Sequence, residues 1–119
     1  MIVSNIEEKF KTINEYWQPK IIAELNGQAV KIAKVKGAFI WHKHDHEDEL
    51  FLVHKGSLRM EFRDKVERIK EGEILVVPKG VEHRPVAEEE TEIIMFEPLA
   101  TLNTGNIQNE RTVSAPERI

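Results

Sequence analysis

The sequence predicts an all-β domain, a sandwich or barrel of antiparallel strands, preceded by one short helix. Apolar, strand-length runs recur at roughly ten-residue spacing, and clusters of glycine, proline, asparagine and charged residues separate them. Spacing of this kind is typical of β-sandwiches and barrels. A chain of 119 residues can bury one core of ordinary size and is short for two. We therefore expect a single domain.

The first segment, residues 1–19, is predicted to be a helix followed by an extended connection. Ser4 and Glu7 form the S-x-x-E pattern of a capping box. The helix is expected to end near Asn14, and Pro19 favours extended backbone before it. Trp17 is interpreted as a residue packed into the core. The apolar residues predicted to share one helical face are Ile6, Phe10 and Ile13.

The barrel is expected over residues 20–97, and it begins with a hairpin. Two strand-like runs, 20–25 and 28–35, flank Asn26-Gly27, a strong hairpin signal. In the second run Lys34 shares a face with Val30 and Ile32. If that face lines the barrel, Lys34 lies at the rim of a pocket as a cation for an anionic ligand; otherwise Lys34 is solvated beyond a bulge at Gly37. The residues of the opposite face are Ala29, Lys31, Ala33 and Val35.

Residues 37–56 contain four of the five histidines of the chain. His42 and His44 are two positions apart, so on a strand both side chains would leave the same face. The polar residues 45–48 are typical of a turn, after which Glu49 begins another strand. A chain reversal would bring the two imidazoles and this carboxylate together, as divalent transition metals with mixed nitrogen and oxygen ligands require. A distant ligand is also expected, and His83 is the remaining histidine.

The strand that starts at Glu49 is apolar on both faces, as expected for a strand buried between the barrel interior and a second sheet or subunit. Phe51 and Val53 share the side of Glu49. His54 takes the opposite side with Leu50 and Leu52, so we expect it at the surface or at an interface. His46 is predicted to be an exposed turn residue, with an accessory role at the pocket mouth as the alternative. Further strands are expected over residues 57–63, 66–69, 74–77, 83–87 and 91–97.

Three features of the remaining sequence lead to expectations about loops and the C-terminus. Residues 57–63 alternate between apolar and charged side chains, which is typical of a half-exposed antiparallel strand. Three glutamates, 88–90, are predicted to form a solvated loop. Residues 98–119 have no hydrophobic period and many turn formers, so they are interpreted as an extended arm that covers a surface.

Composition excludes several classes of function. The chain has no cysteine, so neither disulfides nor a thiolate zinc site can form, and this is compatible with a reducing cytoplasm. The 17 basic and 21 acidic residues are interspersed and give a net charge of −4, which argues against nucleic acid as a partner. No segment is typical of a signal peptide or a membrane span. We expect a cytoplasmic protein with a small-molecule ligand.

Two spaced motifs resemble the signatures of the cupin superfamily. They are G-x4-H-x-H-x4-E-x6-G from Gly37 to Gly56 and G-x5-P-x-G-x2-H from Gly72 to His83. This chain departs from the family pattern in two ways. The gap from the first glycine to the first histidine is four residues, not the usual five. Ala87 stands where an asparagine often follows the second motif. The resemblance covers residues 37–97 and implies a double-stranded β-helix, the jelly-roll barrel. It also implies that the metal ligands are His42, His44, Glu49 and His83.

The whole chain resembles small single-domain cupins that are often labelled by analogy with mannose-6-phosphate isomerase. The resemblance implies a divalent transition metal, one of Mn, Fe, Co, Ni, Cu and Zn, and a homodimer. It also implies isomerisation of a sugar or keto acid, or oxygen insertion as in cupin dioxygenases, with Glu49 as a catalytic base. The alternative is a cupin that binds or senses a small ligand without turnover, because no second catalytic group stands out.

Overall fold

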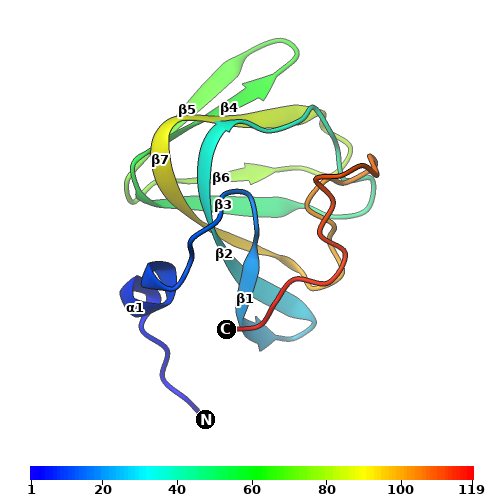
Figure 1. Cartoon of the computed structure of the whole chain (residues 1–119). Helices are drawn as coiled ribbons and strands as arrows, with labels where there is room; N and C mark the ends of the chain where they lie inside the picture. The colour runs from blue at the N-terminus through cyan, green and yellow to red at the C-terminus, as the bar shows by residue number, and fades with distance from the viewer.

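The protein is described by a computed structural model that covers residues 1–119, and it folds into a barrel of antiparallel strands with a short helix on its outside (Figure 1). No helix is long and apolar enough to cross a membrane. The elements are α1 (Ile6–Lys11), β1 (Lys20–Leu25), β2 (Gln28–Ala38), β3 (Glu49–Lys55), β4 (Ser57–Phe62), β5 (Val66–Lys70), β6 (Ile74–Val77) and β7 (His83–Pro98). This architecture confirms the predicted all-β cupin jelly roll with one N-terminal helix.

The long strand β7 joins the two sides of the barrel. Its first residues, 83–86, pair with β4, and its last residues, 91–98, pair with β2. Residues 92–96 also pair with β3, so the main path of the sheet runs β1-β2-β7-β3-β6. The predicted hairpin at Asn26-Gly27 is confirmed by the antiparallel pairing of β1 with β2. One end of β7 thus carries His83 to the site described below.

The predicted loop at residues 88–90 is wrong, because these glutamates lie within the continuous strand β7. Their side chains are exposed, so the run does not place charge in the core. The Arg59 guanidinium donates to the Glu88 carboxylate over 2.6 Å, and the Tyr16 hydroxyl donates to Glu90 over 2.8 Å. Solvent and these two partners satisfy the carboxylates, so the charge run does not end the strand.

Helix α1 starts one residue later than the capping-box prediction. The side chain of Asn5, not Ser4, accepts a hydrogen bond from the Glu8 amide over 2.9 Å. The helix ends at Lys11, before the expected Asn14. Phe10 is buried against the outer face of the barrel, whereas Ile6 is 38% exposed.

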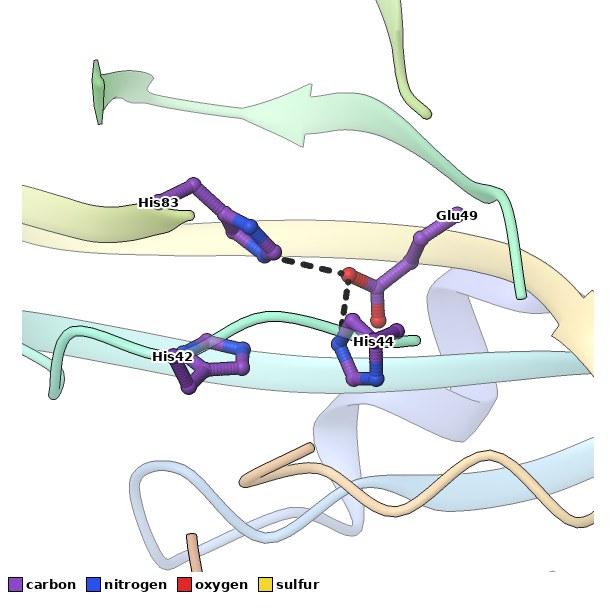
Figure 2. Close-up of side chains that lie close together, drawn as sticks. All are labelled: His42, His44, Glu49 and His83. Atoms are coloured by element: carbon purple, nitrogen blue, oxygen red, sulfur yellow. Dashed lines mark ion pairs between the residues drawn. The ribbon is translucent and has the colours of Figure 1, made fainter. Parts of the chain in front are cut away.

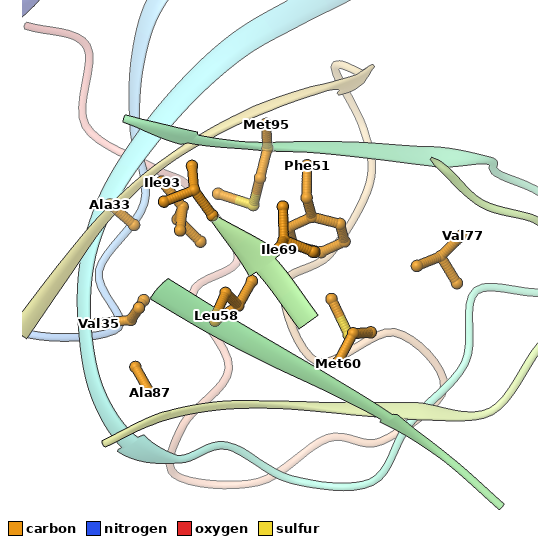
Figure 3. Packing of buried hydrophobic residues seen from close by; sticks show 11 residues of the cluster. Ala33, Val35, Phe51, Leu58, Met60, Ile69, Val77, Ala87, Ile93 and Met95 are labelled. Atoms are coloured by element: carbon orange, nitrogen blue, oxygen red, sulfur yellow. The ribbon is translucent and has the colours of Figure 1, made fainter. Parts of the chain in front are cut away.

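The hydrophobic core fills the barrel between β2, β3, β4 and β7 (Figure 3). The alternation predicted for β4 is confirmed, since Leu58 and Met60 are fully buried. Phe51 and Val53 of β3 also point inward, as expected. The cluster consists of Ala33, Val35, Phe51, Val53, Leu58, Met60, Ile69, Val77, Ala87, Ile93 and Met95.

The outer face of the barrel is also apolar, and α1 covers only part of it. Ile32 packs with Phe10 and Ile13 beneath the helix. Farther along the sheet, Ile74 is 59% exposed and Val76 is 49% exposed. Strand β3 is apolar on both faces. One face lies in the core, and the other lies on this outer surface, where Leu50 pairs with Val76.

Candidate metal centre

Four predicted ligands meet at one end of the barrel, brought there by three segments (Figure 2). His42 and His44 lie in the loop between β2 and β3, Glu49 is the first residue of β3, and His83 is the first residue of β7. All four side chains are at least 97% buried. The histidine pair does not lie on a regular strand, because the only ladder contact in the loop is a bridge between His42 and His83.

This bridge places two of the four ligands side by side. The His42 amide donates to the His83 carbonyl over 3.0 Å, and the His83 amide donates to the His42 carbonyl over 2.8 Å. Residues directly opposite each other in an antiparallel pair project to the same side. The centroids of the two imidazole rings are accordingly 4.4 Å apart. Two backbone hydrogen bonds thus bring together residues that are 41 positions apart in the sequence.

The potential ligand atoms of the four residues all lie within 4.8 Å of one another. His44 Nε2 is 3.2 Å from Glu49 Oε1, and His83 Nε2 is 3.5 Å from the same oxygen. Figure 2 shows both imidazoles turned toward this carboxylate oxygen. The structure therefore brings together the set that the sequence predicted.

Backbone carbonyls fix the orientation of two imidazoles. The Nδ1 atom of His42 lies 2.9 Å from the Ile40 carbonyl oxygen, and Nδ1 of His83 lies 2.8 Å from the Val81 carbonyl oxygen. A carbonyl oxygen can only accept, so in each ring Nδ1 carries the proton. The lone pair of Nε2 is then free, which is the arrangement that carbonyl partners impose on metal-binding histidines.

Several buried polar atoms of the cluster have no hydrogen-bond partner. They include His44 Nε2, His83 Nε2 and Glu49 Oε1, which approach one another without the alignment of a hydrogen bond. Buried polar atoms without partners cost free energy. A divalent cation at their centre would satisfy these three atoms with nitrogen and oxygen ligands. The residues therefore fit a metal ion, and this cluster could hold one.

The charges of the cluster also fit a cation. Burial, assisted by His83, lowers the pKa of His42 to about 4, so this imidazole is neutral at pH 7. Burial alone would raise the pKa of Glu49, but His44 and His83 lower it to about 2, so its carboxylate is ionised. Burial opposes protonation of His44, yet the Glu49 carboxylate outweighs it and raises the pKa of His44. A bound cation would take the place of that proton.

The other two histidines lie outside the cluster. His46 is exposed in the loop, as predicted. His54 lies on the outer face of β3, where its ring stacks on Phe10 with a centroid distance of 5.2 Å. Its Nε2 atom is 3.7 Å from the Glu7 carboxylate and 3.8 Å from that of Glu92. The prediction that His54 is not a ligand agrees with this position.

A cavity of about 40 Å³ adjoins the cluster inside the barrel. His42 and Glu49 form part of its wall, so the candidate metal centre faces the cavity directly. Trp17 closes one side, with its indole stacked on Phe39 at 4.8 Å, and its Nε1 donates to the Lys36 carbonyl over 2.8 Å. The apolar part of the wall consists of Ala33, Val35, Phe39, Phe51, Ile93 and Met95.

A buried lysine in the cavity wall, Lys31, was not predicted from the sequence, because only the opposite face of β2 was considered as a possible barrel interior. One face of β2 is fully or almost fully buried inside the barrel, and its residues are Ala29, Lys31, Ala33 and Val35. Ile32 instead points outward beneath α1. Lys34 is therefore not at the pocket rim. The signal for Lys31 was its alternation with Ala29, Ala33 and Val35, all small or medium apolar residues.

Lys31 is paired with a second buried titratable side chain, Glu97. Its Nζ atom is 3.7 Å from Oε2 of Glu97, and both side chains are 3% exposed. Nζ also donates to the Thr101 carbonyl over 3.1 Å. Burial and the neighbouring Glu49 carboxylate raise the pKa of Glu97 well above its usual range, although Lys31 acts in the opposite direction. The cavity wall thus contains two residues of the metal cluster, His42 and Glu49, and next to Glu49 a buried polar pair.

The C-terminal arm lies on the chain's own barrel and touches the ligand loop. The Asn106 amide donates to the Lys43 carbonyl over 3.0 Å, and the Lys43 amide donates to Oδ1 of Asn106 over 2.9 Å. Lys43 stands between the two histidines of the loop. Farther along, the Arg111 guanidinium donates to the Ala38 carbonyl over 3.1 Å. The arm therefore holds the backbone that carries His42 and His44.

Comparisons with known proteins give a family and close structural relatives. A cupin-2 domain protein from Shewanella frigidimarina is 46% identical, with a TM-score of 0.80 over 81% of this chain and 94% of that one. Protein NMB1881 from Neisseria meningitidis is 34% identical, with a TM-score of 0.76 over 82% and 99%. An uncharacterised Bacillus subtilis protein, YdbB, is 41% identical over 64 residues, which are 53% of this chain and 57% of that protein.

The sequence model of the cupin domain matches residues 30–98, which include all four candidate ligands. This match covers more than half of the chain, and the two solved structures share both the fold and more than 30% of the residues. The chain therefore belongs to the cupin family.

Proposed function

We propose that this protein binds a divalent transition metal and acts as an enzyme on a small oxygenated molecule. The observation that carries the proposal is the set of unpartnered ligand atoms within 4.8 Å of one another at the wall of a cavity. The residues that would hold the ion are His42, His44, Glu49 and His83.

Three imidazoles and one carboxylate suit any of Mn, Fe, Co, Ni, Cu and Zn. Four protein ligands leave one or two positions of a five- or six-coordinate ion open, as in catalytic sites. When bound, such an ion supplies Lewis acidity to a substrate oxygen or a site for oxygen. The open positions would face the cavity, because His42 and Glu49 are part of its wall.

The chain's own residues would position the substrate and move a proton. Glu49 faces both the cluster and the cavity, so its carboxylate is placed to accept a proton from a bound molecule. Phe51, Val35 and Met95 give the cavity apolar walls, which favour a carbon skeleton and limit water. The carbonyls of Ile40 and Val81 keep two imidazoles in one orientation.

Two reaction types remain within this proposal, isomerisation of a sugar or keto acid and oxygen insertion. The names of the three relatives described above give no reaction, so neither is preferred. The alternative is a cupin that binds or senses the same kind of molecule without turnover. The position of Glu49 between cluster and cavity favours the enzyme.

The first test is the metal content of the purified protein and of its variants. Changing His42, His44 or His83 to Ala should each reduce bound metal at least about tenfold, as loss of a metal ligand or its partner commonly does. His46→Ala and His54→Ala are matched controls, and they should keep the unmodified metal content. Full occupancy in His83→Ala would overturn the proposed centre.

The second test separates catalysis from binding. The Fe(II) form is supplied with diketones and catechol-like compounds while oxygen uptake is followed, and other metal forms are supplied with small aldoses, ketoses and keto acids. Turnover that Glu49→Gln abolishes would support the enzyme. Saturable binding of these compounds without any product would support the alternative.

A further inference from the structure

The polar groups of the cavity wall beside the metal cluster have unused hydrogen-bonding capacity. Oε2 of Glu97 and Oγ1 of Thr101 are buried and have no hydrogen-bond partner. Lys31 Nζ carries three donors, of which one reaches the Thr101 carbonyl; Glu97, at 3.7 Å, is beyond hydrogen-bond length. The three residues are 2%, 3% and 4% exposed and all line the cavity. Buried polar groups with unmet hydrogen bonds lower the stability of the fold.

We propose that Lys31, Glu97 and Thr101 form a second binding point, which receives a hydroxyl group of the substrate while another substrate oxygen faces the metal centre. This inference rests on the proposed function and narrows it to one substrate class, small hydroxy-carbonyl compounds. Lys31, Glu97 and Thr101 are then residues that determine specificity.

A hydroxyl group matches the chemistry of this point better than an anion does. A hydroxyl both donates and accepts, so it can accept from the Lys31 ammonium and donate to the Glu97 carboxylate. A carboxylate can only accept, and it would lie beside Glu97 as well as Lys31. The Thr101 hydroxyl can serve as either partner. The match does not depend on whether Glu97 carries a proton, since a hydroxyl can exchange roles.

The size and walls of the cavity limit the rest of the molecule. A volume of about 40 Å³ favours a small molecule. Apolar side chains such as Val35, Ile93 and Met95 line the rest of the cavity. A molecule that fits both polar groups has a short carbon skeleton with two oxygens close together. Hydroxyacetone, with a hydroxyl and a carbonyl on neighbouring carbons, is the simplest probe with these features.

The test measures binding of hydroxyacetone to the zinc-loaded protein by calorimetry. Methoxyacetone has the same skeleton without the hydroxyl proton, and acetone has no second oxygen. Hydroxyacetone should bind at least about fivefold more tightly than either, because only its hydroxyl can both donate and accept among Lys31, Glu97 and Thr101. Equal affinity for hydroxyacetone and methoxyacetone would overturn the inference while leaving the metal proposal standing.

Variants test whether Lys31 and Thr101 account for the binding of hydroxyacetone. Thr101→Val removes the unpartnered hydroxyl with little change of volume, and it should weaken hydroxyacetone binding about three- to tenfold. It should also leave the melting temperature of the metal-free protein unchanged or higher, because a buried hydroxyl without a partner is lost. Lys31→Met should weaken binding by more than about tenfold. Lys34→Met, a lysine of the same strand outside the cavity, is the matched control and should have no effect.

The outcomes distinguish the second binding point from the proposed metal-dependent function. Unchanged affinity in Thr101→Val and Lys31→Met, with metal content intact, would overturn the second binding point alone. If Lys31→Met fails to fold because Glu97 is left without its partner, Thr101→Val still decides the question. A protein that takes up no metal would overturn the proposed function and this inference together.

Discussion

The contact between Gly105 and the ligand loop allows a quantitative prediction about the arm. Gly105 has a φ of +56°, and a Cβ atom there would lie 2.2 Å from the Lys43 carbonyl oxygen. Gly105→Ala therefore introduces two costs, a left-handed backbone and a clash with main chain that cannot rotate away. The left-handed conformation costs about 1 kcal/mol for a residue with a side chain. Relief of the clash requires the arm to move.

Movement of the arm breaks the two hydrogen bonds between Asn106 and Lys43. Each contributes about 1 kcal/mol net, so Gly105→Ala should lower the free energy of unfolding by about 3 kcal/mol. Gly72→Ala is the matched control, because Gly72 has a φ of +79° and no atom within 4 Å of the added Cβ. It should cost only about 1 kcal/mol.

Urea unfolding followed by circular dichroism measures both variants. The difference of about 2 kcal/mol between them isolates the arm contact from the backbone cost. Equal loss in Gly105→Ala and Gly72→Ala would refute the view that the arm is anchored on the ligand loop. A drop in metal affinity in Gly105→Ala alone would show in addition that the anchor positions the histidines on either side of Lys43.

Two further predictions concern acid stability and assembly. The folded-state pKa of His42, about 4, is below its ordinary 6.5, so the unfolded chain binds more protons between these values. The metal-free protein should therefore lose up to about 3 kcal/mol of stability as the pH falls from 6.5 to 4. Urea titrations at each pH measure this loss, and His42→Gln should make it smaller. Equal losses in the two proteins would contradict the low pKa of His42. We also predict a homodimer through the uncovered outer face, where Ile74, Val76 and Phe96 are 59%, 49% and 37% exposed. Light scattering at micromolar concentration should give a dimer mass that Val76→Lys reduces to a monomer, and a monomeric unmodified protein would count against it.

The structural features that could be predicted best from the sequence are those that depend on local alternation or on the spacing of motifs. Leu58 and Met60 alternate with charged residues, so their burial followed from period two alone. The four candidate ligands were identified by fixed spacings to glycines and a proline. Their convergence needed one tertiary contact, the bridge between His42 and His83, which the family pattern implied.

The inner face of β2 could not be predicted from alternation because apolar residues are buried on both faces of the strand. Ile32 is as buried as Val35, but it packs beneath α1 and not in the barrel. The more hydrophobic face, with Val30 and Ile32, was therefore taken as a possible interior. The strand β7 was misjudged for a related reason, since the exposed glutamates 88–90 find solvent and the side chains of Arg59 and Tyr16 without leaving the strand.

The polar pair in the cavity depends on contacts between segments far apart in the chain. Lys31 comes from β2, Glu97 from the end of β7, and the carbonyl that Lys31 contacts belongs to Thr101 at the start of the arm. Only His42 and Glu49 of the cavity's polar wall lie within the two motifs, whereas Lys31 and Thr101 lie outside them. If both proposals hold, proteins that share the motifs can hold the same kind of metal and still differ in the group that they recognise beside it. In this chain the proposed second binding point comes from β2, the end of β7 and the arm, and not from the residues that define the two motifs.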